Sequence, residues 1–173
     1  INKKDNSFPF EYKFINKDYI LMTNRIKKVE DLGILLREGK FQTLFDLVGI
    51  INQSDPKQAY LNNAEKIYMQ RFRENKKIEN LYSILITQIL ERKIQQAEKT
   101  INTILEFDSN NKNAYLIKSI ISVYLLDKDQ ARLSLNKTKQ MDNSFENQEI
   151  TNIIEGLTYL LEMKFINAYK TFT

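Results

Sequence analysis

The residue types that perform most enzyme chemistry are absent from this 173-residue chain, which contains no cysteine and no histidine. Their absence excludes thiol nucleophiles, disulfides, Ser-His-Asp triads, imidazole acid–base catalysis and the common zinc sites. Carboxylate pairs such as Glu74 with Glu79, or Asp127 with Asp129, fall in polar segments without the apolar surroundings that raise a pKa. We therefore expect a protein that is not an enzyme.

Two partial ligand-binding motifs fail at the positions that bind the ligand. The segment from Asp108 to Lys112 begins like a calcium loop, but lysine occupies a ligand position and the required glycine and closing glutamate are missing. Gly33 and the Gly39-Lys40 pair suggest a phosphate-binding loop, yet five residues separate the glycines and Phe41 stands where Ser or Thr is needed. We expect no metal site and no cofactor.

The positive charge is weak evidence for a nucleic-acid partner. The net charge of +4 comes from acidic and basic residues mixed along the chain rather than from a basic run. Arg71 and Arg73 beside Phe72 could hold a phosphate or stack on a base, but an exposed helix end explains them more simply. We do not expect nucleic acid to be the partner.

Composition favours one helical domain. Four glycines and two prolines are few, and an apolar fraction of 42% is ordinary for a protein with a buried core. No apolar stretch approaches the ~20 residues of a membrane span. The chain begins with Ile1, so membrane attachment would depend on an upstream segment. The sequence leaves the compartment open between cytoplasmic and, if a cleaved export signal preceded Ile1, periplasmic or membrane-anchored.

The first 17 residues predict an extended arm followed by a helical domain over 18–173. Phe8, Phe10, Tyr12 and Phe14 alternate with polar residues or Pro9, which fits a helix interior poorly. Beyond the arm, apolar residues recur at three- and four-residue steps. The predicted helices cover residues 18–37, 41 to the Asp55-Pro56 pair, 57–73, 80–91, 94–107, 113–126, 130–141, 148–163 and 165 onward.

The segment from Asn80 to Asn143 nearly repeats itself at a step of 34 residues. Ala97 and Ala131 are separated by this step, as are Ile101 and Leu135. A period of this length is typical of arrays of helical hairpins. The array predicts a protein that holds other proteins.

These hairpins resemble the tetratricopeptide repeat, whose 34-residue unit has a small or apolar residue midway in the first helix and an alanine early in the second. The matching residues are Leu85, Ala97 and Ile101; Ser119, Ala131 and Leu135; Gly156, Tyr159, Ala168 and Phe172; and a shorter copy in Leu32-Gly33, Gly39, Phe41 and Asp55-Pro56. The resemblance covers about three quarters of the chain and implies an all-α, right-handed solenoid of antiparallel hairpins. Lys118 and Glu155 depart from it, because the family places a buried apolar residue at both positions.

The resemblance implies a scaffold that binds a helix or peptide of another protein in a groove lined by the first helices of the hairpins. The residues that this register assigns to the groove are Tyr82, Ile86, Ile89 and Leu90; Leu116, Ile120, Val123 and Tyr124; and Ile153, Leu157, Leu160 and Leu161. All twelve are apolar or aromatic. They could equally be core contacts between neighbouring helices of an irregular bundle with a structural or nucleic-acid-binding role.

The C-terminal residues predict an uncovered apolar face. Phe165, Ala168, Tyr169 and Phe172 are spaced to pack on the preceding helix, and no polar capping helix follows them. We expect the chain to be a fragment, or to be capped there by another molecule, with self-association through the C-terminal hairpin as one outcome.

Overall fold

The computed structural model describes residues 27–54, 60–141 and 148–172, and all regular structure in these ranges is helical. The prediction of an all-α protein is confirmed for them. The predicted arm over residues 1–17 and the Asp55-Pro56 pair lie outside the described residues. The helices are residues 27–38, α2 (Phe41–Ser54), α3 (Tyr60–Asn75), α4 (Ile78–Leu90), α5 (Ile94–Phe107), α6 (Lys112–Tyr124), α7 (Lys128–Met141), α8 (Gln148–Leu161) and α9 (Phe165–Phe172).

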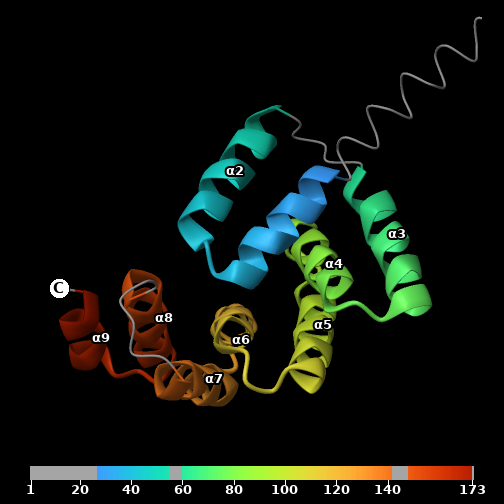
Figure 1. Ribbon diagram of the computed structural model, residues 1–173. Coiled ribbons are helices and arrows are strands. Elements are labelled where there is room, and N and C mark those ends of the chain that lie inside the picture. Colours follow the sequence, from blue (N-terminus) through green and yellow to red (C-terminus); the bar gives the residue numbers. More distant parts are fainter. Residues whose placement is uncertain (1–26, 55–59, 142–147, 173) are drawn as a thin grey trace, which may run out of the picture.

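Helices from α3 onward pack mainly on their neighbours in sequence. The hairpins α4–α5, α6–α7 and α8–α9 are joined by contacts of α5 with α6 and of α7 with α8, and α6 also touches α8. In Figure 1 the helices succeed one another from α3 on the right to α9 on the left, and no labelled helix lies beyond α9. The predicted bounds of α5 and the predicted start of α9 are confirmed.

A buried alanine near the start of the second helix allows the two helices of each hairpin to approach closely. Ala97, Ala131 and Ala168 are all at most 1% exposed. One turn later, Ile101 and Leu135 are fully buried in α5 and α7. A methyl side chain at the contact leaves room for the large residues of the first helix, so the 34-residue step in the sequence corresponds to a packing position.

The same backbone turn ends the first helix of each hairpin. Arg92, Leu126 and Met163 have positive φ angles of 58°, 61° and 59°. The residue after each of them donates its backbone N–H five residues back, as in the 2.8 Å bond from Lys93 N to Gln88 O. Each left-handed residue itself donates to the carbonyl three residues earlier, at 3.0–3.1 Å. These are the two bonds of a Schellman motif, repeated in three hairpins.

The 27–38 helix packs across α3 and α4. Gly33 approaches Ser83 so closely that an added Cβ would lie 3.0 Å from the Ser83 backbone nitrogen. Arg37 forms a 2.6 Å ion pair with Glu79 at the start of α4. Since α4 also contacts α3 and α5, it is enclosed by three helices, and every residue from Asn80 to Gln88 is buried.

Replacing Arg92 with glycine should stabilise the fold. A left-handed conformation costs an ordinary residue about 1–2 kcal/mol, and glycine avoids this cost at the expense of a more flexible unfolded chain. We expect Arg92→Gly to raise the free energy of unfolding by about 0.5–1 kcal/mol in urea titration. Arg92→Ala is the matched control and should give no gain. A glycine variant no more stable than the alanine variant would contradict the turn assignment.

Candidate protein-binding surface

The polar segments that the sequence suggested as ligand sites are used for turns and helix contacts. The Asp108 carboxylate accepts hydrogen bonds from the Asn110 backbone N–H (3.3 Å) and the Asn111 amide (3.0 Å). Arg71 lies 5.2 Å from the Tyr68 ring centre and 3.8 Å from Glu30. Among residues 27–54, 60–141 and 148–172, no group of three His, Cys, Asp or Glu residues is placed to hold a metal ion.

A recess between the 27–38 helix and α4 is too small for a typical substrate. It holds about 50 Å³ and is lined by Gly33, Arg37, Glu79, Tyr82 and their neighbours. Small-molecule sites usually measure roughly 300–1,000 Å³. The helices of the described ranges also include none long and apolar enough to cross a membrane. The recess is therefore no candidate for a substrate site.

The twelve predicted groove residues differ in exposure from one end of the array to the other. Those of α4 lie in or beside the core, those of α6 are mixed, and most of those of α8 are exposed. The buried ones are Tyr82, Ile86 and Leu116; Ile89, Leu90, Ile120, Val123 and Leu161 are half-buried; Tyr124, Ile153, Leu157 and Leu160 are exposed.

The chain itself encloses the α4 end of this surface. Tyr82 lines the recess beside Gly33 and Arg37 of the 27–38 helix, and its side chain is fully buried. Burial, together with the nearby Asp108 carboxylate, raises the pKa of the Tyr82 hydroxyl to about 12. In α4, Tyr82 and Ile86 therefore belong to the core and are not available to a partner.

The α8 end presents the same residue types to solvent. Ile153, Leu157 and Leu160 follow one another at steps of four and three residues, so they form a single stripe along the helix. They are 46%, 38% and 41% exposed, whereas Ile154 and Thr158 on the adjacent face are buried. We call this set the α8 stripe. Together with Tyr124 of α6, it is the part of the predicted groove that remains accessible.

The helix α9 adds a second exposed apolar set next to α8. Phe165, Ile166 and Tyr169 are 66%, 72% and 69% exposed, and Met163 in the corner is 78% exposed. Phe172 packs against Gly156 of α8 so closely that an added Cβ would overlap its ring. The spacing predicted that Phe165 and Tyr169 pack on the preceding helix, and their exposure shows that this prediction is wrong for these two residues. The sequence also gave no sign that Met163 occupies a left-handed corner pointing outward.

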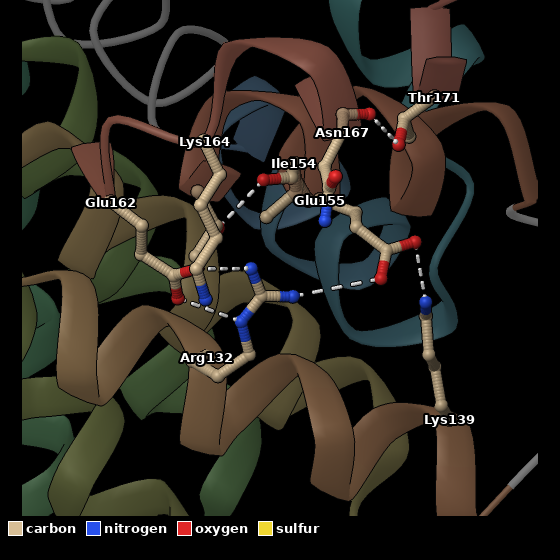
Figure 2. Close-up of polar contacts among 9 residues, drawn as sticks. Arg132, Lys139, Ile154, Glu155, Glu162, Lys164, Asn167 and Thr171 are labelled. Carbon is tan, nitrogen blue, oxygen red and sulfur yellow. Dashed lines mark hydrogen bonds and ion pairs between the residues drawn. The ribbon is translucent and has the colours of Figure 1, made fainter. Parts of the chain in front are cut away.

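An ion-pair network fixes α8 on α7 (Figure 2). The Arg132 guanidinium of α7 donates two hydrogen bonds to Glu162, at 2.9 and 3.0 Å. It also lies 3.6 Å from Glu155 and 4.3 Å from the centre of the Tyr159 ring. Lys139 completes the network with a 2.6 Å bond to Glu155. Glu155, at which the resemblance implied an apolar residue, is thus paired with two cations supplied by α7.

Another polar network joins α3, α4 and α5. The Glu65 carboxylate accepts hydrogen bonds from Lys93 (2.6 Å) and Gln88 (2.9 Å), and Gln88 accepts one from Thr100 (2.7 Å). Burial tends to raise the pKa of Glu65, but the bonds from Lys93 and Gln88 outweigh it and the pKa is lowered. Because each carboxylate in the two networks is paired with a cation, we interpret both as structural.

A scan against protein-family models gives no match for this chain, and neither a search of curated protein sequences nor one of solved structures gives a match.

The Glu162 ion pair should make the thermal stability of the protein depend on pH. Its hydrogen bonds from Arg132 lower the pKa of Glu162 from 4.5 to about 2 in the folded protein. A lowered folded-state pKa contributes stability above pH 4.5, and this contribution is lost as the pH falls toward 2. We expect Glu162→Gln to melt at a lower temperature than the natural protein at pH 6, with the difference vanishing near pH 2. An equal difference at both pH values would show that the ionised carboxylate is not responsible.

Proposed function

We propose that this chain is a non-catalytic protein-interaction module built as a TPR-like right-handed solenoid. Its α8–α9 end binds an amphipathic helix or peptide of a protein partner. The proposal assigns binding to the exposed part of the predicted groove, the α8 stripe with the neighbouring residues of α9. It assigns a structural role to the buried part in α4.

The repeated hairpin geometry supports the solenoid. Three hairpins share a left-handed corner residue and a buried alanine five residues after it, at Ala97, Ala131 and Ala168. Each alanine also donates its backbone N–H to the residue four before it, at 3.0 Å. Contacts of α8 with both α6 and α7 join one hairpin to the next, which is how stacked repeats bury their apolar faces.

The single observation that carries the binding proposal is the exposure of the α8 stripe. Tyr82, Leu116 and Ile153 hold equivalent positions in α4, α6 and α8, yet their exposed fractions are 0%, 1% and 46%. Large contiguous apolar patches are rare on isolated soluble proteins and usually mark interaction sites. Apolar residues spaced along a helix face fit the apolar side of a partner helix.

Aspartate substitutions separate the binding surface from the core. Leu157→Asp changes an exposed residue, so we expect the free energy of unfolding to change by about 1 kcal/mol or less. Affinity capture from native cell extract should lose its partner with this variant. Leu133→Asp, on a 54% exposed leucine of α7, is the matched control and should retain the partner.

Substitution of Ile86, the buried residue of α4 that corresponds to Leu157 of α8, should instead unfold the protein. Ile86 is 2% exposed, and an unpaired carboxylate there should cost about 4 kcal/mol or more. Circular dichroism and thermal melting distinguish the two effects. If Leu157→Asp keeps its helicity and melting temperature but captures the same proteins as the natural chain, the α8 stripe is not the binding surface.

A further inference from the structure

The 27–38 helix lies on α4 in the way that an amphipathic partner helix would. Val29, Leu32 and Leu36 are at most 4% exposed, and with Gly33 they follow one another at steps of three, one and three residues. This spacing places all four on one face, and it is the spacing by which a helix fills an apolar groove. Gly33 of this face lies directly against α4.

Ion pairs on both sides give this helix a direction. Arg37 pairs with Glu79 of α4 at 2.6 Å, and Glu30 lies 3.8 Å from Arg71 of α3. These side chains are 39–51% exposed, so the pairs contribute little to stability, but they favour one orientation over its reverse. The surface therefore suits a helix with an acidic residue after its first apolar anchor and a basic residue after its last.

The helix α6 receives the C-terminal end of the same segment. The Asn113 amide donates a 3.0 Å hydrogen bond to the Arg37 carbonyl, which belongs to the last turn, where carbonyl groups lack partners within their own helix. Gly39 lies so close to Asn113 that an added Cβ would overlap its side chain. The surface thus combines a wall from α4 with a polar group from α6 that binds a helix end.

The hairpin formed by the 27–38 helix and α2 is joined to the array mainly through the first of its two helices. In Figure 1 the 27–38 helix lies between α2 and α4. Within the described ranges, α2 packs on none of the helices α3–α9 as extensively as neighbouring helices of the array pack on one another. A recess of about 50 Å³ also remains between the 27–38 helix and α4. Withdrawal of one helix would therefore uncover the face of α4 that carries Tyr82.

We propose that this face of α4 is a second helix-binding site and that the 27–38 helix is its internal ligand, which keeps the site closed. The partner is an amphipathic helix with the same anchor spacing, a small residue at the third anchor, and charges that match Glu30 and Arg37. It binds by exchange, because both helices need the same face. The tethered helix competes at a high effective concentration, which lowers the apparent affinity for the partner.

The proposed site is distinct from the α8 stripe. The inference therefore goes beyond the proposed function, and either one can fail without the other.

The variant Gly33→Val of the full chain should open the site. Its added Cβ would lie 3.0 Å from the Ser83 backbone nitrogen, and valine favours a helix more than glycine does, so the contact is weakened and the helix is not. The probe is a fluorescent synthetic peptide with the sequence of residues 27–38. We expect fluorescence anisotropy to show that the variant binds this peptide roughly tenfold or more tightly than the natural chain does.

Matched controls use the same chemistry. Gly33→Val placed in the peptide should abolish its binding to either chain, because the peptide then meets Ser83 in the same way. Asp31→Val changes an exposed residue of the same helix, and a chain with this substitution should bind the natural peptide no more tightly than the natural chain does. Circular dichroism measures whether each variant is folded.

Reversal of the exposed ion pair tests the site without changing its apolar packing. Arg37→Glu in the chain brings two carboxylates together at Glu79 and should raise the affinity for the natural peptide roughly twofold to fivefold. Glu79→Arg in the chain should reverse the preference, so that a peptide carrying Arg37→Glu binds more tightly than the natural peptide.

A folded Gly33→Val chain that binds the natural peptide no more tightly than the natural chain does overturns the inference. Equal binding of the natural peptide and the peptide carrying Gly33→Val also overturns it, because the association then does not use the Ser83 contact. If Gly33→Val unfolds the chain, the charge variants decide. In that case a Glu79→Arg chain that does not prefer the peptide carrying Arg37→Glu shows that the inference is wrong.

Discussion

One backbone conformation determines how each hairpin is built, since a single left-handed residue reverses the chain between its two helices. Arg92, Leu126 and Met163 adopt this conformation without being glycine, so the packing on either side must compensate for its cost. The turn brings the second helix back at a fixed position. Five residues later the buried alanine lies against the first helix, where a larger side chain would separate the pair.

The contacts between hairpins are chemically more varied than the contacts within them. At the junction of α7 with α8, paired charges and one aromatic ring make the contact, centred on Arg132. At the junction of α3, α4 and α5, a buried carboxylate is hydrogen-bonded to Lys93 and Gln88. Such contacts require partners from particular helices, so they fix which hairpins can be neighbours more strictly than apolar packing does.

Local sequence signals were sufficient to predict that the described ranges are helical and that α4 pairs with α5, α6 with α7 and α8 with α9, but they did not predict the packing of α3 on α4. The bounds of α5 and the start of α9 follow from apolar periodicity ending at short polar corners. The left-handed corners were not predictable, because Arg, Leu and Met are not typical of that conformation. The ion pairs of Glu155 with Arg132 and Lys139 were not predictable either, because both cations come from another helix.

Exposure at the candidate site could not be predicted from residue type. Tyr82 and Ile153 occupy equivalent positions and are both large and apolar, but one is buried and the other is 46% exposed. Their difference arises from what lies next to each helix: the 27–38 helix covers Tyr82, and none of the described helices covers Ile153 to the same extent. Sequence periodicity identifies a face, whereas the number of neighbours decides whether that face is core or surface.

The hairpins differ in how many helices surround them, and this difference affects which part of the fold unfolds first. In an array where each unit is held mainly by its neighbours, local unfolding begins where neighbours are fewest. The α4 helix is surrounded on three sides, while α9 packs on α8, in part through the contact of Phe172 with Gly156. Amide protons should therefore exchange fastest in α9, more slowly in α6 and α7, and slowest in α4. We then expect the native ensemble to contain a minor population in which only the hairpin α8–α9 has opened and the other hairpins remain folded.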